Sequence, residues 1–461
     1  MIGALALIAA WITAITLIRT TGVFAAVGQM GRATQRSLRI IRRSRVSEWA
    51  KERAIQLVSF RIIGASLGVL LRVLLIASPF VLVFALDAWH PFGVRAAFVD
   101  WRLRLVLLAA AVVIILVMRR RRSASGSTDT MMMRVGLSKP ALEIAFDIER
   151  QMFAARAGEP AERPVFVAGL ARAGTTIVTR TLLGLGDYAT NRYRDLPFPL
   201  APNLWAQLSK GMNRKVVATE RGHGDGLMHD LDSPEAIEEV FWLLKEGARY
   251  RRPDGLHAVQ PEPDTLRDFR TFVACTMLRD RKSGYLSKNN NNILRLEGLV
   301  EAFPQAVLVH PFREPVQQAA SLLNQHVRAC ALAAEDPGRG AFMSALGHHE
   351  FGADHRPFVL GDEVVAGDPA TLDYWVRRWI ATYRFLLDQP APVAARQIFV
   401  DYDDLAAGRL DAIYRIAGAS AERAPPEAMR PPRAHGADAV DPALGAEAAA
   451  LHTRLVARAV A

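Results

Sequence analysis

Three long apolar tracts dominate the N-terminal part of the chain, at about residues 1–18, 62–86 and 103–118. A helix needs roughly 20 apolar residues to cross a bilayer, and each tract comes close to this length or exceeds it. Arg72 interrupts the second tract, so we expect its side chain either to reach toward a basic membrane surface or to face protein. We therefore predict a membrane region over residues 1–122 with three transmembrane helices.

The positive charge of the chain lies mainly beside these tracts. Residues 1–135 hold 19 of the 57 Lys and Arg residues but only 5 of the 46 Asp and Glu residues. Cytoplasmic loops are enriched in Lys and Arg, so we expect residues 32–53 and 119–122 to be cytoplasmic. This predicts a multi-pass protein of a bacterial-type inner membrane with a cytoplasmic catalytic part. The basic excess indicates the lipid bilayer as a partner and argues against nucleic-acid binding.

The pattern changes after residue 122. Residues 123–135 are small and polar, which is typical of a flexible linker. Apolar residues then recur at helical spacing over residues 142–153 and 177–185, and buried-strand patterns cover residues 163–169, 305–312 and 396–405. We predict a folded domain over residues 136–418. Residues 419–461 are rich in Ala and Pro, and we interpret them as a peripheral C-terminal tail.

A glycine-bounded loop, Gly169 to Thr176, connects the first predicted strand of this domain to a helix. Backbone N–H groups in such a loop and at a helix N-terminus bind phosphate. The loop matches GxxxxGK[ST] in its glycines and its last threonine, but Thr175 stands where nucleoside triphosphatases have lysine. Arg172 supplies a cation earlier in the loop, so a phosphate site is predicted and a nucleoside-triphosphate kinase fits it less well.

The loop resembles the donor loop of the PAPS-dependent sulfotransferases, which reads (K/R)SGTT after the first strand. PAPS is the sulfuryl donor 3′-phosphoadenosine 5′-phosphosulfate. The matching residues are Arg172, Ala173, Gly174, Thr175 and Thr176, with alanine in place of the usual serine. The resemblance implies that Arg172 lies on the 5′-phosphosulfate near its bridging oxygen and that Gly174 to Thr176 hold the phosphate.

A second pair of residues follows the strand pattern at 305–312. Arg313 comes directly after this pattern, and Ser321 lies eight residues later on a predicted helix. Arginine offers a phosphate a forked, charged contact, and serine offers a hydroxyl donor. Taken alone, the pattern is explained equally well if Arg313 forms an ordinary surface ion pair and Ser321 is a packing residue. Sulfotransferases use this arrangement for the donor's 3′-phosphate, which is the role that the resemblance implies.

Lys288 precedes Arg313 by 25 residues, and the family has a lysine on a loop at similar spacing. The resemblance implies that Lys288 neutralises charge on the leaving phosphosulfate oxygen. The run Asn289–Asn292 is interpreted either as amides that fix donor or acceptor or as a solvated turn. Cytosolic sulfotransferases have a histidine base two residues after the lysine, and Asn290 fills that position here.

Because Asn290 cannot take a proton, we expect the base elsewhere, and two candidates remain open. Asp195 lies close to the position at which Golgi-type and bacterial relatives have a carboxylate. His223 lies in a glycine-rich loop dense in His and Asp, and we rank it slightly behind Asp195. That loop fits no ligand spacing that we know, and the two cysteines, Cys275 and Cys330, form no disulfide or zinc pattern, so no metal is expected.

The resemblance spans roughly residues 160–405 and implies an α/β domain with a P-loop-like sulfotransferase fold. A central parallel sheet of about five strands, flanked by helices, would follow the transmembrane region and bind the donor at its carboxyl ends. The late strand ends in Tyr402 to Leu405, which we interpret as structural. Residues 342–352 and the aromatic residues Tyr374, Trp375 and Trp379 are expected either to line the acceptor side or to pack in the core.

The function predicted from these patterns is sulfuryl transfer from PAPS to a hydroxyl or amine of an unidentified acceptor. The membrane region favours a membrane-associated glycan or lipid as that acceptor. Two alternatives are a P-loop kinase of a small molecule or lipid, and a non-catalytic membrane-bound nucleotide-binding or scaffold protein.

Overall fold

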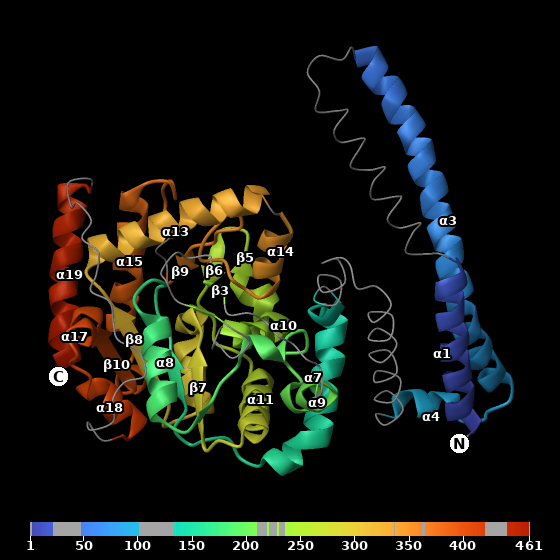
Figure 1. Cartoon of the computed structure of the whole chain (residues 1–461), viewed down its shortest axis with the longest axis horizontal. Helices are drawn as coiled ribbons and strands as arrows, with labels where there is room; N and C mark the ends of the chain where they lie inside the picture. The colour runs from blue at the N-terminus through green and yellow to red at the C-terminus, as the bar shows by residue number, and fades with distance from the viewer. Residues whose placement is uncertain are drawn as a thin grey trace. The chain divides into compact units, whose positions relative to one another are not determined.

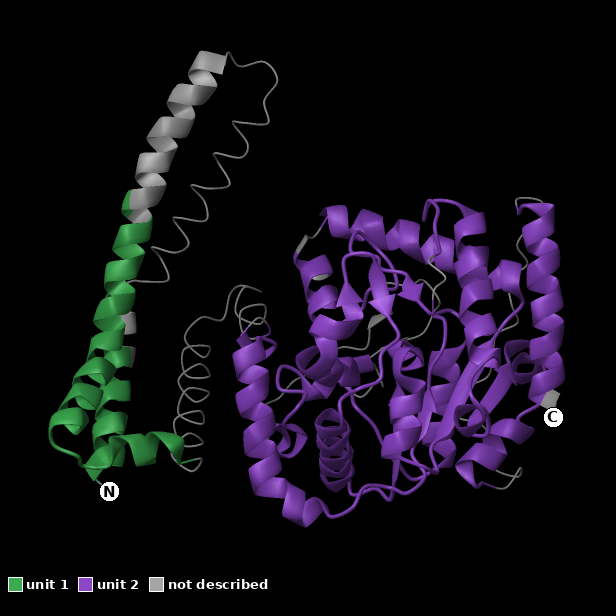
Figure 2. Cartoon of the chain, turned by 180° about the vertical axis from the view of Figure 1, so that it is seen from behind, with its two compact units in different colours: residues 1–125 green, residues 126–461 purple. Residues whose placement is uncertain are grey.

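The computed structural model describes residues 2–21, 48–100, 133, 135–209, 219–220, 228–229, 236–335, 337–361, 365–419 and 440–460. The chain divides into two compact units, residues 1–125 and 126–461, which Figure 2 shows in different colours. The division falls inside the segment predicted as a linker.

The first unit is helical where it is described, with α1 (Ile2–Thr21), α3 (Glu48–Trp89) and α4 (Val94–Val99). Within the described part, only the segment Ser66–Trp89 of α3 is long and apolar enough to cross a membrane. The apolar part of α1, Ile2–Ala14, is shorter, and the predicted span at residues 103–118 lies outside the described residues. The predicted multi-pass arrangement is therefore not supported, whereas a single membrane-spanning helix is compatible with the structure.

Arg72 faces protein, which decides between the two alternatives that the sequence left open. Its Nε donates a hydrogen bond to the Thr21 carbonyl oxygen (3.0 Å), and its Nη1 donates to the Gly68 carbonyl oxygen (2.8 Å). The last carbonyls of a helix have no partner within the helix, so the guanidinium satisfies one at the end of α1. At its other end α1 packs closely, because Gly3 lies against Gly93 and Val94.

The second unit is built on a five-stranded parallel sheet in the order β10-β8-β1-β7-β2 (Figure 1). Its strands are β1 (Val165–Val167), β2 (Tyr188–Ala189), β7 (Gly284–Lys288), β8 (Val307–Phe312) and β10 (Gln397–Asp401). Every neighbouring pair is parallel, which confirms the predicted sheet of about five strands. The segments that follow β1, β7, β8 and β10 therefore meet along one edge of the sheet.

Side chains of the sheet alternate between two hydrophobic cores. Val165 and Val167 of β1 pack into one core, whereas Phe166 between them packs into the other. The same alternation holds in β7, where Tyr285 and Leu286 point to opposite cores. Both faces are covered, so the strands read as continuous apolar runs, as is usual for buried parallel sheets.

The described helices of the second unit surround this sheet (Figure 1). They are α7 (Lys139–Ala157), α8 (Thr175–Leu185), α9 (Pro202–Leu208), α10 (Glu239–Tyr250), α11 (Pro263–Asp280), α12 (Leu296–Ala302), α13 (Pro315–Glu335), α14 (Pro337–Ala345), α15 (Leu372–Leu387), α16 (Ala391–Ala394), α17 (Tyr402–Ala406), α18 (Asp411–Ala417) and α19 (Pro442–Val460). Three short 3-10 helices accompany them, η1 (Tyr193–Asp195), η2 (Ala236–Glu238) and η3 (Asn290–Arg295).

Two smaller sheets lie outside the central one. The strands β5 (Arg251–Arg252), β6 (Gly255–His257) and β9 (Phe358–Val359) form a three-stranded sheet. The strands β3 (Thr219–Glu220) and β4 (Met228–His229) form an antiparallel pair.

The interpretation of residues 419–461 as a peripheral tail was wrong for the last part of this segment. Residues 442–460 form α19, and Leu444, Ala448, Leu451 and Leu455 are buried in the main core. These four residues share one face of a helix, and alanine favours helix strongly. The end of the chain is therefore part of the folded unit, packed against α15 and β10.

Candidate active site

The loop after β1 has the shape of a phosphate-binding turn. Arg172 has φ 68° and Gly174 has φ 91°, both in the left-handed region. Few non-glycine residues adopt this region, and those that do often lie in functional sites. Gly174 caps α8, whose first residues are Thr175 and Thr176. The first N–H groups of α8 have no partners within the helix, so this end of α8 favours an anion.

Tyr402 restricts the loop residue at position 174 to glycine. A Cβ atom on Gly174 would lie 2.6 Å from Cδ2 of the Tyr402 ring, closer than such atoms approach. Tyr402 is the first residue of α17 and follows directly on β10, so it reaches the loop from the edge strand of the sheet. The sequence indicated only a structural role for Tyr402, and this contact with the loop appears only in the fold.

The structure brings the two predicted donor motifs into contact. Nε of Arg172 donates a hydrogen bond to Oγ of Ser321 on α13 at 3.0 Å, across 149 positions of sequence. The contact follows from the topology, because β1 and β8 pair in parallel and the loop after β1 lies beside the start of α13. The two motifs thus form one polar surface.

Arg313 lies between β8 and α13 on the same surface. Its guanidinium carbon lies 5.1 Å from the centre of the Tyr402 ring, and Nη2 donates to Oε1 of Gln317 at 3.1 Å. Burial lowers the pKa of Arg313 from its usual value, and the positive charge of Arg172 lowers it further. Its buried Nε has no hydrogen-bond partner among the residues that the structure describes. A buried N–H donor without a partner is costly, and a phosphate oxygen would satisfy it.

A second layer of side chains supports the donor loop. Nε2 of Gln318, on α13, donates to the Ala171 carbonyl oxygen at 3.0 Å. The Gln318 amide is itself held, because Oε1 accepts from Nε1 of Trp379 at 3.0 Å and lies 3.4 Å from the Tyr383 hydroxyl. Trp379 is therefore a core residue that also fixes the loop. Of the two alternatives that the sequence left open for Trp379, the acceptor side and the core, the structure supports the core.

Lys288 is the last residue of β7 and lies opposite Val167 of β1 in the parallel ladder. This register places Lys288 at the same sheet edge as the donor loop. The Asn289 backbone N–H continues the ladder by donating to the Val167 carbonyl oxygen at 3.1 Å.

The four asparagines after Lys288 are buried, so the solvated-turn interpretation of this run was wrong. Nδ2 of Asn289 donates to Glu239 at 2.7 Å, and Nδ2 of Asn292 donates to Glu238 at 3.0 Å. Both carboxylates lie at the start of α10, and Arg295 adds a two-pronged ion pair to Glu239 at 3.0 and 3.1 Å. The amides thus hold buried carboxylates in place beside the end of β7.

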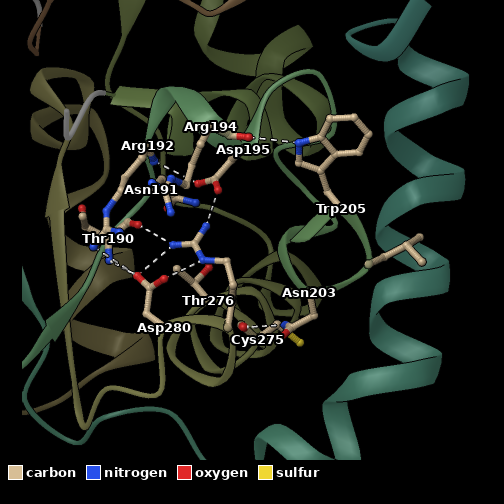
Figure 3. A network of polar contacts seen from close by, with 12 residues as sticks. Thr190, Asn191, Arg192, Arg194, Asp195, Asn203, Trp205, Cys275, Thr276 and Asp280 are labelled. Atoms are coloured by element: carbon tan, nitrogen blue, oxygen red, sulfur yellow. Dashed lines mark hydrogen bonds and ion pairs between the residues drawn. The ribbon is translucent and has the colours of Figure 1, made fainter. Parts of the chain in front are cut away.

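The structure places Asp195 in a buried ion-pair network (Figure 3). Arg279 pairs with Asp195 and also with Asp280, to which its Nε donates at 2.8 Å. The other Asp195 oxygen accepts from the Arg192 backbone N–H at 2.9 Å. Only 3% of the Asp195 side chain is exposed. Asp195 thus holds the segment between β2 and α9 against α11, and both of its oxygens are engaged.

His223, the other predicted base, lies outside the described residues. Over the described part of the chain, no group of three or more His, Cys, Asp and Glu side chains is arranged to hold a metal ion.

Comparison with known proteins agrees with this geometry. A family model described as "Sulfotransferase family" matches residues 164–339, which contain β1, the donor loop, Lys288, Arg313 and Ser321. This segment, which is less than half of the chain, is similar to the sulfotransferase family. No curated protein sequence matches the chain.

Solved structures of bacterial sulfotransferases also resemble the chain, at low identity. Sulfotransferase STF1 from Mycobacterium tuberculosis is 17% identical with a TM-score of 0.39, over 61% of this chain and 74% of its own. STF9 from Mycobacterium avium is 13% identical with a TM-score of 0.32, over 68% and 74%. A sulfotransferase from Alicyclobacillus acidocaldarius is 15% identical with a TM-score of 0.25, over 64% and 94%.

Proposed function

We propose that the chain is a membrane-anchored sulfotransferase that transfers the sulfuryl group of PAPS to a hydroxyl or amine of a glycan or lipid acceptor. The observation that carries this proposal is the contact between Arg172 and Ser321, which joins the two donor motifs into one cationic surface. The buried Nε of Arg313, without a hydrogen-bond partner in the described part of the structure, provides a donor that fits a phosphate oxygen.

The residues divide the donor between them in this proposal. The N-terminus of α8 and Arg172 hold the 5′-phosphosulfate, and Arg313 and Ser321 hold the 3′-phosphate. An acceptor oxygen or nitrogen attacks sulfur as the bond from sulfur to the bridging phosphate oxygen breaks. Lys288, at the end of the neighbouring strand, stabilises the negative charge that develops on this oxygen. As in phosphoryl transfer, positioning and electrostatic stabilisation supply most of the catalysis.

The segment Ser66–Trp89 serves as the membrane anchor in this proposal. The arginines at residues 119–122 favour the cytoplasmic side of the membrane, so the second unit, which follows them, is expected there. An anchor of this kind keeps the enzyme close to acceptors that are confined to the bilayer surface, such as lipid-linked glycans.

Calorimetric titration of the full chain in detergent with PAP, the desulfated donor, tests the donor site. We expect a Kd of about 1 to 10 µM for PAP and no measurable binding of ATP. Substituting Arg313→Gln removes a charged contact worth about 1.5–3 kcal/mol, so we expect PAP affinity to fall roughly 10- to 150-fold.

The matched control is Arg328→Gln, on the exposed side of the same helix α13, which should leave PAP affinity unchanged. ATP binding in place of PAP would support the kinase alternative instead. PAP binding that is equally strong in Arg313→Gln and in the wild type would remove Arg313 from the donor site.

A further inference from the structure

The position that holds the histidine base of cytosolic sulfotransferases is occupied here by Asn290, and the structure shows what this asparagine contacts. Its Nδ2 donates to Oε1 of Glu350 at 3.3 Å, although the two residues are 60 positions apart. Asn290 is 7% exposed, and its Oδ1 has no hydrogen-bond partner among the described residues. A buried amide with an unsatisfied oxygen, two residues after Lys288, indicates a polar site that a ligand completes.

Glu350 belongs to a short loop after α14 that also carries His348. Nδ1 of His348 lies 3.6 Å from Oε2 of Glu350, within ion-pair distance. The loop is fixed to the asparagine run at a second point, because Nδ2 of Asn291 donates to the Gly347 carbonyl oxygen at 3.1 Å. Two consecutive asparagines thus dock a histidine–carboxylate pair beside the end of β7.

The charges around the pair suit a base. Burial raises the pKa of Glu350, but the hydrogen bond and positive charge of His348 outweigh this and lower it to about 2. Glu350 is therefore ionised at neutral pH. Charged groups packed against the loop include Glu239 at the start of α10, which Gly347 touches, and the buried Arg378 of α15, which attracts Glu350. Asp354 and Arg356 act on the adjacent His349. The side chains of His348 and Glu350 are 12% and 15% exposed and that of Asp195 is 3% exposed, but Nε2 of His348 is itself buried, so an acceptor reaches it only when neighbouring side chains move.

We propose that His348 is the general base of sulfuryl transfer, that Glu350 orients it, and that Asn290 holds Glu350; this inference rests on the proposed function. The acceptor O–H or N–H gives its proton to Nε2 of His348 as the acceptor atom bonds to sulfur. The bond between sulfur and the bridging phosphate oxygen breaks, and PAP leaves with the electron pair. The imidazolium that forms is stabilised at Nδ1 by the Glu350 carboxylate, as in other histidine–carboxylate pairs.

The neighbouring histidines are engaged in other contacts. Nδ1 of His349 pairs with Asp354 at 3.1 Å, and its side chain is only 1% exposed. Nε2 of His355 accepts hydrogen bonds from the Tyr374 hydroxyl (2.8 Å) and from Arg378 (3.0 Å). Burial, together with the charge of Arg378, lowers the pKa of His355 to about 3. Its Nε2 already accepts two hydrogen bonds, so His355 is a poor base. His348 is the histidine of this segment whose ring pairs with the carboxylate that Asn290 contacts.

The test uses the full chain in detergent and needs no identified acceptor, because water is the acceptor. Two quantities are measured for each variant, the Kd of PAP by calorimetry and the rate of sulfate release from radiolabelled PAPS. General-base catalysis contributes about 10²–10⁴-fold, so His348→Gln should lower sulfate release at least about 100-fold. Its PAP affinity should stay within about twofold of the wild type, because the base contacts the acceptor and not the donor phosphates.

The matched control is His257→Gln. His257 of β6 also pairs with a carboxylate, since its Nε2 lies 3.0 Å from Asp254, but it belongs to the separate three-stranded sheet. This variant should keep both PAP affinity and sulfate release. If His348→Gln does not fold, Glu350→Gln provides the second measurement.

Glu350→Gln should leave a pH signature that a structural role would not. Sulfate release by the wild type should rise with pH over about pH 5–8, the range in which histidines titrate. The neutral amide no longer stabilises the imidazolium, so the rise should move to lower pH in Glu350→Gln and disappear in His348→Gln. A pH profile unchanged in Glu350→Gln would contradict the orienting role.

The outcomes separate this inference from the proposed function. If the wild type does not bind PAP, the proposed function fails and the inference fails with it. If the wild type binds PAP but His348→Gln releases sulfate at the wild-type rate, only the assignment of the base fails. The assignment also fails if the wild type binds PAP but releases sulfate no faster than buffer alone.

Discussion

Two groups of arginines in the second unit differ in the partners that surround them. Arg279 is buried between two carboxylates, Asp195 and Asp280, and Arg295 makes a two-pronged ion pair with Glu239. Arg313, at the edge of the sheet, contacts the neutral amide of Gln317 and the ring of Tyr402. In the first group the charge is neutralised within the protein, so it stabilises the fold. The charge of Arg313 at the sheet edge is available to attract an anion. This difference distinguishes arginines that stabilise the fold from an arginine of the binding site.

The largest expected effect tests the scaffold side of this comparison. Arg279→Gln leaves Asp195 buried without its cation and leaves Asp280 with Arg192 as its cation, at 3.5 Å. Removing one partner of a buried ion pair typically costs about 3–5 kcal/mol. We expect the free energy of unfolding to fall by this amount in a urea titration of the full chain. The pKa of Asp280, which burial raises but Arg279 keeps below its usual value, should rise in the variant.

Arg313→Gln is the matched substitution at the site. It removes a partly desolvated cation that forms no ion pair with the described carboxylates, although Asp403 and Glu314 attract it, so the free energy of unfolding should change by less than about 1 kcal/mol while PAP binding weakens. The distinction between scaffold and site would be lost if both variants destabilised the protein equally.

The outcome for Asp195 shows what the sequence could not reveal. Its distance from the donor loop along the chain suggested a base, but its partner Arg279 lies 84 positions away. The asparagine run has the same difficulty, because its partners Glu238 and Glu239 lie 50 or more positions away. A sequence pattern reports neighbours in the chain, whereas the role of a buried charge depends on partners that only the fold brings together.

The sheet and the donor loop, in contrast, were predictable. Strands that are buried on both faces appear in the sequence as continuous apolar runs. The glycines of the donor loop favour its left-handed conformation without any contact from distant parts of the chain. The buried face of α19 could also have been predicted from the helical spacing of four residues, Leu444, Ala448, Leu451 and Leu455. It was missed because prolines between residues 425 and 432 made the whole segment look irregular.

A further prediction concerns His310, which contacts the residue that precedes the donor loop. His310 of β8 is fully buried, its Nδ1 donates to the Ala168 carbonyl oxygen at 2.8 Å, and burial lowers its pKa from 6.5 to about 4. Above pH 6.5 the histidine is neutral in both folded and unfolded chains and has no effect on the pH dependence. Between pH 6.5 and about 4 the unfolded chain binds a proton that the folded chain excludes, so stability should fall by about 3 kcal/mol.

Urea titrations at several pH values measure this slope. Glutamine at position 310 does not titrate, so His310→Gln should lose that part of the pH dependence while its stability at neutral pH is lower. A slope that is identical in the variant would mean that other groups cause the acid sensitivity.

The smallest expected effect separates backbone strain from the contact with Tyr402. Gly174→Ala forces a side chain into a left-handed conformation and against the Tyr402 ring, whereas Gly418→Ala meets the same left-handed conformation (φ 62°) with no atom within 4 Å of its Cβ. Both variants should lose about 1–2 kcal/mol of stability from the backbone term. Only Gly174→Ala should also weaken PAP binding, roughly tenfold, because its loop must shift.

Adding Tyr402→Ala to Gly174→Ala removes the clash but not the strain, so the double variant shows which of the two sets the shape of the loop. If the two effects were independent, the double variant would lose the sum of the binding free energies that the single variants lose. If it binds PAP more tightly than this sum predicts, the ring and the loop are coupled and Tyr402 is part of the donor site. If the two effects simply add, the left-handed backbone alone sets the loop, and the Tyr402 ring acts on the donor only through Arg313.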